Sequence, residues 1–315
     1  MDQIITTPAL RVKLTGVCNR SCNFCNEEGD MRTIGSMEPD YAFFECVNAL
    51  TAELGIRKVM LTGGEPTIHP HLKEIVHGIE ADEVSITTNG IRPFPVATWG
   101  GLREAGLGKV IVSIHDATPQ AFVQLETRKH KVTWAARAID SQHSNLATAS
   151  QAGLKVRVNV VAYHSQWQVR QVLASLEELE KQYRFDIRLL NDLENIEASQ
   201  QIIRGVCATL GATALNEERR AGSSNVTVQW QTKSGFRFST KMAYPYFFAP
   251  ICDGCQEKDG CHEGFYGIRL EKRGSDHWVR LCISKHTPDV LMPWRSFLAS
   301  SAAQEFKSLC QAEQS

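Results

Sequence analysis

The sequence predicts an α/β fold: a partial (β/α)6 barrel whose parallel strands curl without closing, followed by a smaller C-terminal domain. Between residues 10 and about 190, short runs rich in β-branched residues alternate with helical patterns, which is the rhythm of βαβ units. Such units cross over in the right-handed sense, so each strand can be added beside the last. Cysteines and polar residues directly follow several strands, as expected at the carboxyl-terminal rim of a TIM-like barrel.

The individual elements follow from apolar spacing and from turn residues. Six strands are predicted over Leu10–Thr15, Lys58–Thr62, Glu83–Thr88, Lys109–His115, Lys155–Val161 and Asp186–Leu190. Helices with apolar residues at helical spacing are predicted between them, over Asp40–Leu54, Leu72–Glu80, Thr98–Ala105 and Val169–Gln182. A helix over Ser199–Leu210 and a hairpin of Val226–Trp230 with Phe236–Thr240 come next. We place a domain boundary near residue 200, which separates a barrel of residues 1–200 from a C-terminal domain of residues 201–315.

The composition excludes several classes of protein. The 315 residues are 43% hydrophobic, which is ample for a buried core, and 34 basic residues nearly balance 35 acidic ones. No global basic field therefore indicates a nucleic-acid or membrane-surface protein. The N-terminus lacks a signal-peptide pattern, and no apolar run reaches the roughly 18 residues of a membrane span, so we expect a soluble cytoplasmic protein.

In a reducing compartment, ten cysteines indicate metal or cluster ligation rather than disulfides. Seven of them form two groups. The other three stand alone, and each is expected to be a small buried hydrophobic residue: Cys46, Cys207 and Cys310.

The first group, Cys18, Cys22 and Cys25, follows the first predicted strand with the spacing C-x3-C-x2-C. Three thiolates on one loop can hold three irons of a [4Fe–4S] cluster and leave the fourth iron open for chemistry. Zinc is the competing interpretation, but a zinc site usually takes four ligands from paired C-x2-C knuckles. The sequence offers no fourth cysteine close to this group.

With Phe24 just before its last cysteine, the motif resembles the signature of the radical S-adenosylmethionine (SAM) superfamily. The resemblance implies that the three cysteines bind a [4Fe–4S] cluster and that SAM chelates its open iron. It also implies that Phe24 lies along the adenine of SAM. An electron from such a cluster cleaves SAM to a 5′-deoxyadenosyl radical, and an external donor of the flavodoxin or ferredoxin type would supply that electron.

A second motif ends the second predicted strand and is similar to the glycine-rich GGEP turn of the same superfamily: Gly63, Gly64, Glu65 and Pro66. In the superfamily this turn contacts the amino group of SAM, and glycines permit such a close backbone approach. Taken alone, the motif is more often an ordinary strand-end turn. Three further strand residues stand where superfamily members place polar side chains near SAM, and we interpret them only as a group: Thr87, Ser113 and Asn159.

The second group of cysteines, Cys252, Cys255 and Cys261 followed by Cys282, supplies four thiolates. Four thiolates can close a second [4Fe–4S] cluster or make a tetrahedral zinc site. The spacing resembles part of the auxiliary-cluster domain called SPASM, but the further cysteine expected soon after Cys261 is missing. The resemblance therefore implies a shortened twitch domain with one auxiliary cluster.

Within the superfamily, the layout resembles the GTP cyclase group of molybdenum-cofactor biosynthesis (MoaA-like). That resemblance makes Arg11, Arg157 and Arg269 candidate substrate contacts, since guanidinium matches phosphate and carboxylate well. Solvated arginine is the alternative. Three departures argue against the cyclase activity itself: His69 replaces an expected arginine, the C-terminal glycine pair is missing, and Cys261 offers a fourth ligand that would close the auxiliary cluster.

Our first hypothesis is a radical SAM enzyme that abstracts hydrogen from a small polar substrate, a nucleotide or nucleoside for example, to drive cyclisation, rearrangement or oxidation. A peptide maturase of the SPASM or twitch type is the alternative within the superfamily, and a non-catalytic zinc or iron–sulfur module is the alternative outside it. A catalytic acid or radical relay is not assigned from the sequence, and four rim residues stay open for that role: His115, Asp116, Tyr163 and His164.

Overall fold

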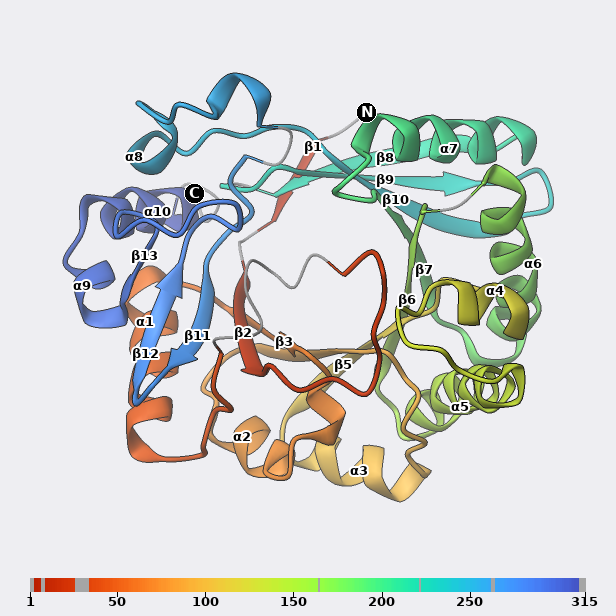
Figure 1. The fold of residues 1–315 in the computed structure, drawn as a ribbon, viewed down its shortest axis with the longest axis horizontal. Coiled ribbons are helices and arrows are strands. Elements are labelled where there is room, and N and C mark those ends of the chain that lie inside the picture. The colour runs from red at the N-terminus through yellow and green to blue at the C-terminus, as the bar shows by residue number, and fades with distance from the viewer. Residues whose placement is uncertain are drawn as a thin grey trace.

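The computed structural model describes residues 3–6, 9–25, 34–163, 165–220, 222–261 and 264–311. Its strands form one sheet across these residues, in the order β1-β8-β9-β10-β7-β6-β5-β4-β3-β2-β11-β12-β13. Figure 1 shows this sheet curved, with helices along its outer side. Within the described residues, no helix has the length and apolar character needed to cross a bilayer.

The centre of the sheet consists of six parallel strands, which match the predicted ones to within two residues at each end. They are β2 (Ala9–Thr15), β3 (Lys58–Gly63), β4 (Glu83–Thr88), β5 (Leu107–Ser113), β6 (Lys155–Val161) and β7 (Asp186–Leu190). Each strand pairs with the next one along the chain, as successive right-handed crossovers require. The predicted α/β fold with a parallel, open-barrel sheet is therefore confirmed.

Helices connect these strands and cover the outer face of the sheet (Figure 1). They are α1 (Tyr41–Leu54), α2 (Leu72–Gly78), α3 (Val96–Glu104), α4 (Pro119–Gln124), α5 (Val132–Gln151) and α6 (Gln166–Tyr183), with a 3-10 turn, η2 (Pro66–Ile68). The four helices predicted between the strands are present. The prediction missed α4 and the long α5, because the buried side of α5 carries Gln142 and Asn145, which interrupt its apolar spacing.

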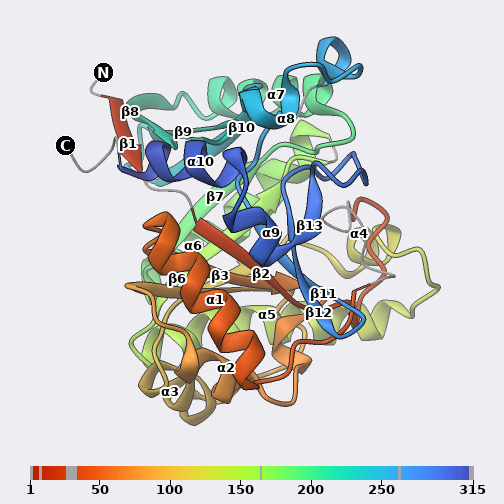
Figure 2. The same cartoon turned by 90° about the vertical axis from the view of Figure 1, so that its left-hand side faces the viewer.

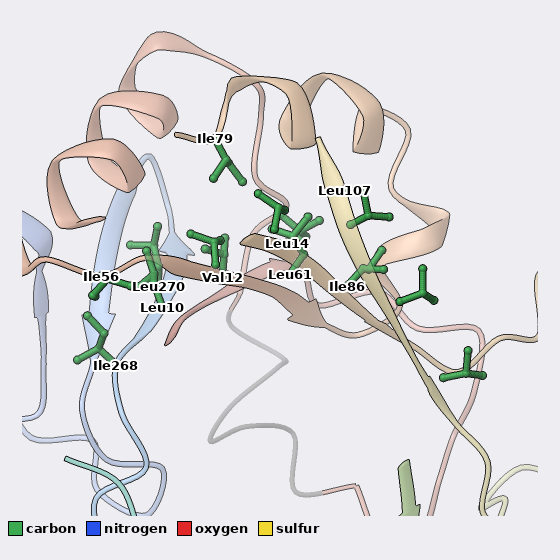
Figure 3. Close-up of a cluster of buried hydrophobic side chains, with 14 of the residues drawn as sticks. Leu10, Val12, Leu14, Ile56, Leu61, Ile79, Ile86, Leu107, Ile268 and Leu270 are labelled. Carbon is green, nitrogen blue, oxygen red and sulfur yellow. The ribbon is translucent and has the colours of Figure 1, made fainter. Parts of the chain in front are cut away.

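The hydrophobic core lies between the outer face of the sheet and these helices. Leu10, Val12 and Leu14 alternate along β2 and are fully buried. Figure 3 shows them packed with apolar side chains of the neighbouring strands, of α2's end and of β11. Alternation is expected of a strand because successive side chains point to opposite faces. The residues between these three therefore face the inside of the barrel.

Residues beyond 190 extend both sides of the parallel sheet. On the β7 side lie α7 (Ile196–Thr209), β8 (Thr213–Arg220), β9 (Asn225–Gln231) and β10 (Arg237–Ala243), and β1 (Gln3–Thr6) pairs with β8. The predicted hairpin is confirmed as β9 and β10, and β10 runs parallel to β7. The predicted helix before it corresponds to α7.

On the β2 side, β11 (Arg269–Arg273) pairs in parallel with β2, and β12 (Asp276–Arg280) and β13 (Leu291–Pro293) follow as antiparallel strands. The remaining elements are α8 (Ala249–Cys252), η3 (Lys258–Gly260), α9 (Trp294–Leu298) and α10 (Ser301–Gln311). Figure 2 shows α9 and α10 beside α1 on this flank. The domain boundary near residue 200 stays a prediction.

Candidate functional site

A cavity of about 360 Å³ lies on the inner face of the barrel strands. Inward-facing residues of the parallel strands are mostly polar or charged, whereas the alternate residues belong to the core. Strands of a parallel sheet that are packed on both faces usually read as continuous apolar runs. The alternation therefore indicates that the barrel interior holds a polar ligand rather than a packed core.

Most of the residues predicted for the SAM site meet in this cavity. Its walls include Cys18, Cys22, Phe24, Cys25, Gly63, Gly64, Thr87, Ser113 and Asn159, together with the three predicted substrate arginines, Arg11, Arg157 and Arg269. Glu65 and Pro66 are not part of the lining, and neither are the four cysteines of the second group. The roles predicted for all of these residues, in binding SAM, a cluster or the substrate, stay predictions.

The three-cysteine loop begins where β2 ends, and Cys25 is its most exposed thiol. Burial raises the pKa of Cys18 and raises the pKa of Cys22 to about 12, and the negative charge of the neighbouring cysteines acts in the same direction. Buried thiols of this kind ionise readily only beside a positive partner such as iron. The donor set therefore fits an iron–sulfur cluster.

A multi-iron cluster and a single metal ion make different demands on their ligands. Among the described residues, no three side chains of His, Cys, Asp or Glu are grouped tightly enough to share one metal ion. In a [4Fe–4S] cluster each thiolate binds a separate iron, so its ligands do not converge on one point.

Gly63 and Gly64 press against the start of the cysteine loop. Gly64 N donates to Thr15 O at 2.7 Å, and Glu65 N donates to Val17 O at 2.9 Å. A Cβ on Gly64 would stand 2.1 Å from Val17 O, and one on Gly63, where φ is +119°, would stand 2.6 Å from Thr15 O. Only glycine permits this approach. The two sequence motifs thus form one continuous backbone surface.

The carboxylate of Glu65 is fully buried and its hydrogen bonds go to the protein itself. It accepts from Thr67 N at 3.0 Å, from Thr88 Oγ1 at 2.6 Å and from Asn89 N at 2.7 Å. Burial raises its pKa, while these hydrogen bonds favour the charged form. In this structure, Glu65 joins the turn after β3 to the turn after β4.

Asn89, in the turn after β4, contacts the cysteine loop directly. Its Nδ2 lies 2.7 Å from Asn19 Oδ1 and 3.9 Å from Cys18 Sγ, to which the Arg20 backbone N–H also donates at 3.4 Å. Buried amides of α5 hold this turn, since Gln142 Nε2 donates to Asn89 O at 2.8 Å and Asn145 Nδ2 donates to Gly90 O at 2.8 Å. Sequence reasoning missed both amides because it missed α5.

Phe24 lies against two of the open candidates for a relay role. Its ring centroid is 4.9 Å from that of His115, edge to face, and 5.2 Å from that of Tyr163. His115 Nδ1 accepts from Val161 N at 3.1 Å, so the proton of the neutral ring sits on Nε2. Asp116 is buried, and His164 lies outside the described residues.

A buried ion pair ties the cysteine loop to the segment that follows α4. Arg20 Nη2 lies 2.6 Å from Glu126 Oε1, and both side chains are almost fully buried. The other oxygen of Glu126 accepts from Ser21 N at 2.8 Å, and the Cys22 and Glu126 backbones form an isolated antiparallel bridge. Sequence reasoning had no signal for Glu126, which lies 106 residues from Arg20.

Positive charge is concentrated on the cavity walls. Six basic side chains line the cavity against three acidic ones, and the basic set adds Arg20, Arg188 and Lys241 to the three predicted arginines. Lys241 Nζ stands 4.7 Å from the ring centroid of Tyr266, and the Arg269 guanidinium stands 6.0 Å from the same centroid. Burial and the nearby Arg157 charge lower the pKa of Lys109, at the base of β5, to about 8. The interior therefore suits an anion.

The second group of cysteines gathers outside the cavity, around α8, η3 and the second residue after β12. Burial is the main cause that raises the pKa of Cys252, and the negative charges of three neighbours raise it further: Cys282, Cys261 and Cys255. Gly264 N donates to Cys261 Sγ at 3.3 Å, and a hydrogen bond from Lys285 lowers the pKa of Cys255. No three of these described thiols converge closely enough to share one metal ion, as a tetrahedral zinc site requires, so their arrangement favours the cluster alternative.

Comparison with known proteins agrees with the first motif. Residues 12–163 match the model of the radical SAM superfamily. A probable GTP 3′,8-cyclase of Sulfurisphaera tokodaii is 36% identical over 156 residues, 48% of this chain and 46% of that protein. One of Pyrococcus abyssi is 32% identical over 154 residues, again 48% of this chain and 46% of that protein. The chain spans about half the length of the curated relatives it matches.

Among solved structures, the crystal structure of Streptococcus suis SuiB aligns with 17% identity and a TM-score of 0.48, over 70% of this chain and 51% of that chain. The likeness is too weak to carry an argument about function.

Proposed function

We propose, because residues 12–163 match the model of the radical SAM superfamily, that this chain cleaves SAM reductively to modify a small anionic substrate inside the barrel. The observation that supports this most directly is the cysteine loop packed against Gly63 and Gly64 at the mouth of a polar cavity. When bound, the cluster and SAM supply a 5′-deoxyadenosyl radical that takes hydrogen from the substrate.

The protein's own residues hold and orient these groups. Cys18, Cys22 and Cys25 would bind three irons, and the inward side chains Thr87, Ser113 and Asn159 stand on successive strands β4, β5 and β6 beneath them. Two hydrogen-bonded networks, Glu65 with Asn89 and Arg20 with Glu126, fix the loop from both sides. Fixed ligands preserve the geometry that a reactive radical needs.

The substrate proposal comes from the basic walls. Arg157 Nε is buried without a hydrogen-bond partner among the described residues, and Arg157 Nη2 stands 3.3 Å from Asp186 Oδ2. Such a guanidinium gains most from a phosphate or carboxylate brought to it, since both match its forked geometry. We therefore propose a small substrate that carries at least one phosphate or carboxylate, such as a nucleotide.

For Cys252, Cys255, Cys261 and Cys282 we propose a second [4Fe–4S] cluster with four thiolate ligands. The four side chains are partly buried and influence one another's charge, which fits a site that is closed by protein ligands. Such a cluster would relay electrons or shape the pocket rather than bind substrate.

Anaerobic reconstitution with iron and sulfide tests the two clusters. We expect about eight irons per chain and a spectral change on adding SAM. That change should vanish in Cys22→Ala and persist in Cys207→Ala, which replaces a buried cysteine of α7 that belongs to neither group. Stoichiometric zinc without iron would refute the proposal, and an unaltered second-cluster spectrum in Cys261→Ala would refute the closed auxiliary site.

The substrate class needs its own test. Release of 5′-deoxyadenosine from SAM should rise when a phosphorylated or carboxylated substrate is present, since substrate binding couples cleavage to hydrogen abstraction. We expect Arg157→Gln and Arg269→Gln to raise the substrate concentration needed, about tenfold or more for a lost charged hydrogen bond. Arg137→Gln, on the exposed side of α5, is the control. Equal stimulation in all three variants would contradict an anion site on these arginines.

A further inference from the structure

The segment that joins α4 to α5 is strongly basic in a chain that is not. Arg128, Lys129 and Lys131 are exposed, and His130 lies between them. The whole chain carries a formal charge of −1, yet the only acidic residue between positions 117 and 139 is Glu126, which is buried against Arg20. The outward charge of this segment is therefore entirely positive.

This charge stands where local helix preferences disfavour it. Lys131 is the N-cap of α5, where within the described residues it makes no side-chain capping bond, and the first turn of α5 contains no acidic residue. The positive end of the helix dipole favours acidic residues and capping side chains at such a position. Departures from local preference of this kind are expected at functional surfaces.

The basic segment is also tied to the cysteine loop. Thr127 N donates to Ser21 O at 2.7 Å, Arg128 N donates to Ser21 Oγ at 3.1 Å, and Asn23 N donates to Leu125 O at 2.8 Å. Ser21 and Asn23 flank Cys22 in the chain. Figure 2 shows α4 beside the red segment that follows β2. The exposed basic segment is therefore hydrogen-bonded to the residues on either side of Cys22, a predicted cluster ligand.

Aromatic contacts connect this surface to the cysteine loop. His130 stacks on Trp134 with centroids 3.9 Å apart, Trp134 meets Phe122 edge to face at 5.5 Å, and the guanidinium of Arg20 lies 4.2 Å from the Phe122 centroid. Phe122 belongs to a small core of its own with residues of α5. A row of contacts therefore runs from the basic segment to the cysteine loop.

We propose that Arg128, Lys129 and Lys131 form the docking surface for a small, acidic electron-carrier protein, an inference that rests on the proposed radical SAM function. Reductive cleavage needs one electron from outside, and its transfer needs the carrier to approach the cysteine loop. The carrier is oxidised by one electron, which passes to the site held by the three cysteines, and no bond or proton changes at the surface. Opposite charges speed such an encounter and orient it.

The test compares two reductants on the reconstituted enzyme, with reduced flavodoxin as the protein probe and dithionite as the small one. The variant carries Arg128→Glu, Lys129→Glu and Lys131→Glu, all at exposed positions. The control carries the same change of charge at exposed lysines remote from the cysteine loop: Lys155→Glu, Lys233→Glu and Lys307→Glu. The readout is the rate of 5′-deoxyadenosine formation with each reductant.

We expect the first variant to lose about tenfold or more of the flavodoxin-driven rate while the dithionite-driven rate is unchanged. The wild-type flavodoxin-driven rate should fall with added salt, because salt screens exposed charges. An equal flavodoxin-driven rate in variant and wild type would overturn the proposal, as would an equal loss in the control. A loss with both reductants would assign the segment to substrate entry instead and overturn docking. Failure of wild type with dithionite would refute the proposed function itself.

Discussion

The contact between Gly64 and the cysteine loop gives a prediction whose size follows from the structure. In Gly64→Ala, the new carbon would lie 2.1 Å from Val17 O, whereas ordinary contact begins near 3.4 Å. The Val17 carbonyl would have to retreat by the difference, and Cys18 N, 3.1 Å from the same carbon, would move with it. The substitution therefore displaces the first cluster ligand as well as crowding the turn.

Two costs combine in this variant. Overpacking costs about 1–3 kcal/mol. The hydrogen bonds from Gly64 N to Thr15 O and from Glu65 N to Val17 O are strained or lost, and each is worth about 0.5–1.5 kcal/mol. We expect Gly64→Ala to lower the free energy of unfolding by about 2–6 kcal/mol, which leaves a folded chain with a displaced loop and less bound iron.

Gly100→Ala is the matched control, because Gly100 lies in α3, where an added Cβ would have no neighbouring atom within 4 Å, and alanine is the better helix former. Urea denaturation under anaerobic conditions gives the free energy of unfolding, and iron per chain after reconstitution reports the loop. The reasoning is refuted if Gly64→Ala matches Gly100→Ala in both stability and iron content.

Three further predictions concern buried charges and thiols. Glu126→Gln leaves Arg20 buried without its counter-charge and should lower the free energy of unfolding by about 3–5 kcal/mol, whereas Arg57→Ala at an exposed pair should change it by less than about 1 kcal/mol; equal effects in urea denaturation would contradict this. Burial acts to raise the pKa of Glu271. Hydrogen bonds from Arg280 and the charge of Lys13 nevertheless hold that pKa below its ordinary 4.5. Its stabilisation is therefore complete above about pH 4.5 and lost as pH falls through the lower folded-state pKa, and Glu271→Gln should lack that acid slope in denaturation curves. In the native chain, iodoacetamide should leave the three lone cysteines, Cys46, Cys207 and Cys310, unmodified, because they are buried. Burial also raises the pKa of Cys207 to about 11. Mass spectrometry before and after urea unfolding checks this.

Much of the barrel could be predicted because its strands repeat a simple alternation. Along β2, Leu10, Val12 and Leu14 pack outward while Arg11 faces the cavity, and this pattern is visible in the sequence itself. The cysteine spacing likewise predicted a site at the end of β2. The expectation that the lone cysteines are buried is also confirmed.

The parts that could not be predicted depend on contacts between distant residues. The helix α5 was missed because Gln142 and Asn145 replace apolar residues on its buried side, where their amides satisfy backbone groups of the turn after β4. Nothing near Arg20 indicates that Glu126 is its partner. The role of Glu65 as a link between two turns could not be predicted either, because its sequence motif resembles a ligand-binding turn. That role is visible only in the three-dimensional structure.

The order of strands in the sheet also matters while the chain is being made. The first parallel strand, β2, has its outer edge covered by β11, whose residues are synthesised more than 250 positions later. The opposite edge of the parallel strands, on β7, is covered by β10, which is also synthesised later. A nascent chain released at residue 200 would present two bare strand edges, which invite pairing with other chains. The sheet therefore keeps an uncovered edge on β2 until β11 has been synthesised.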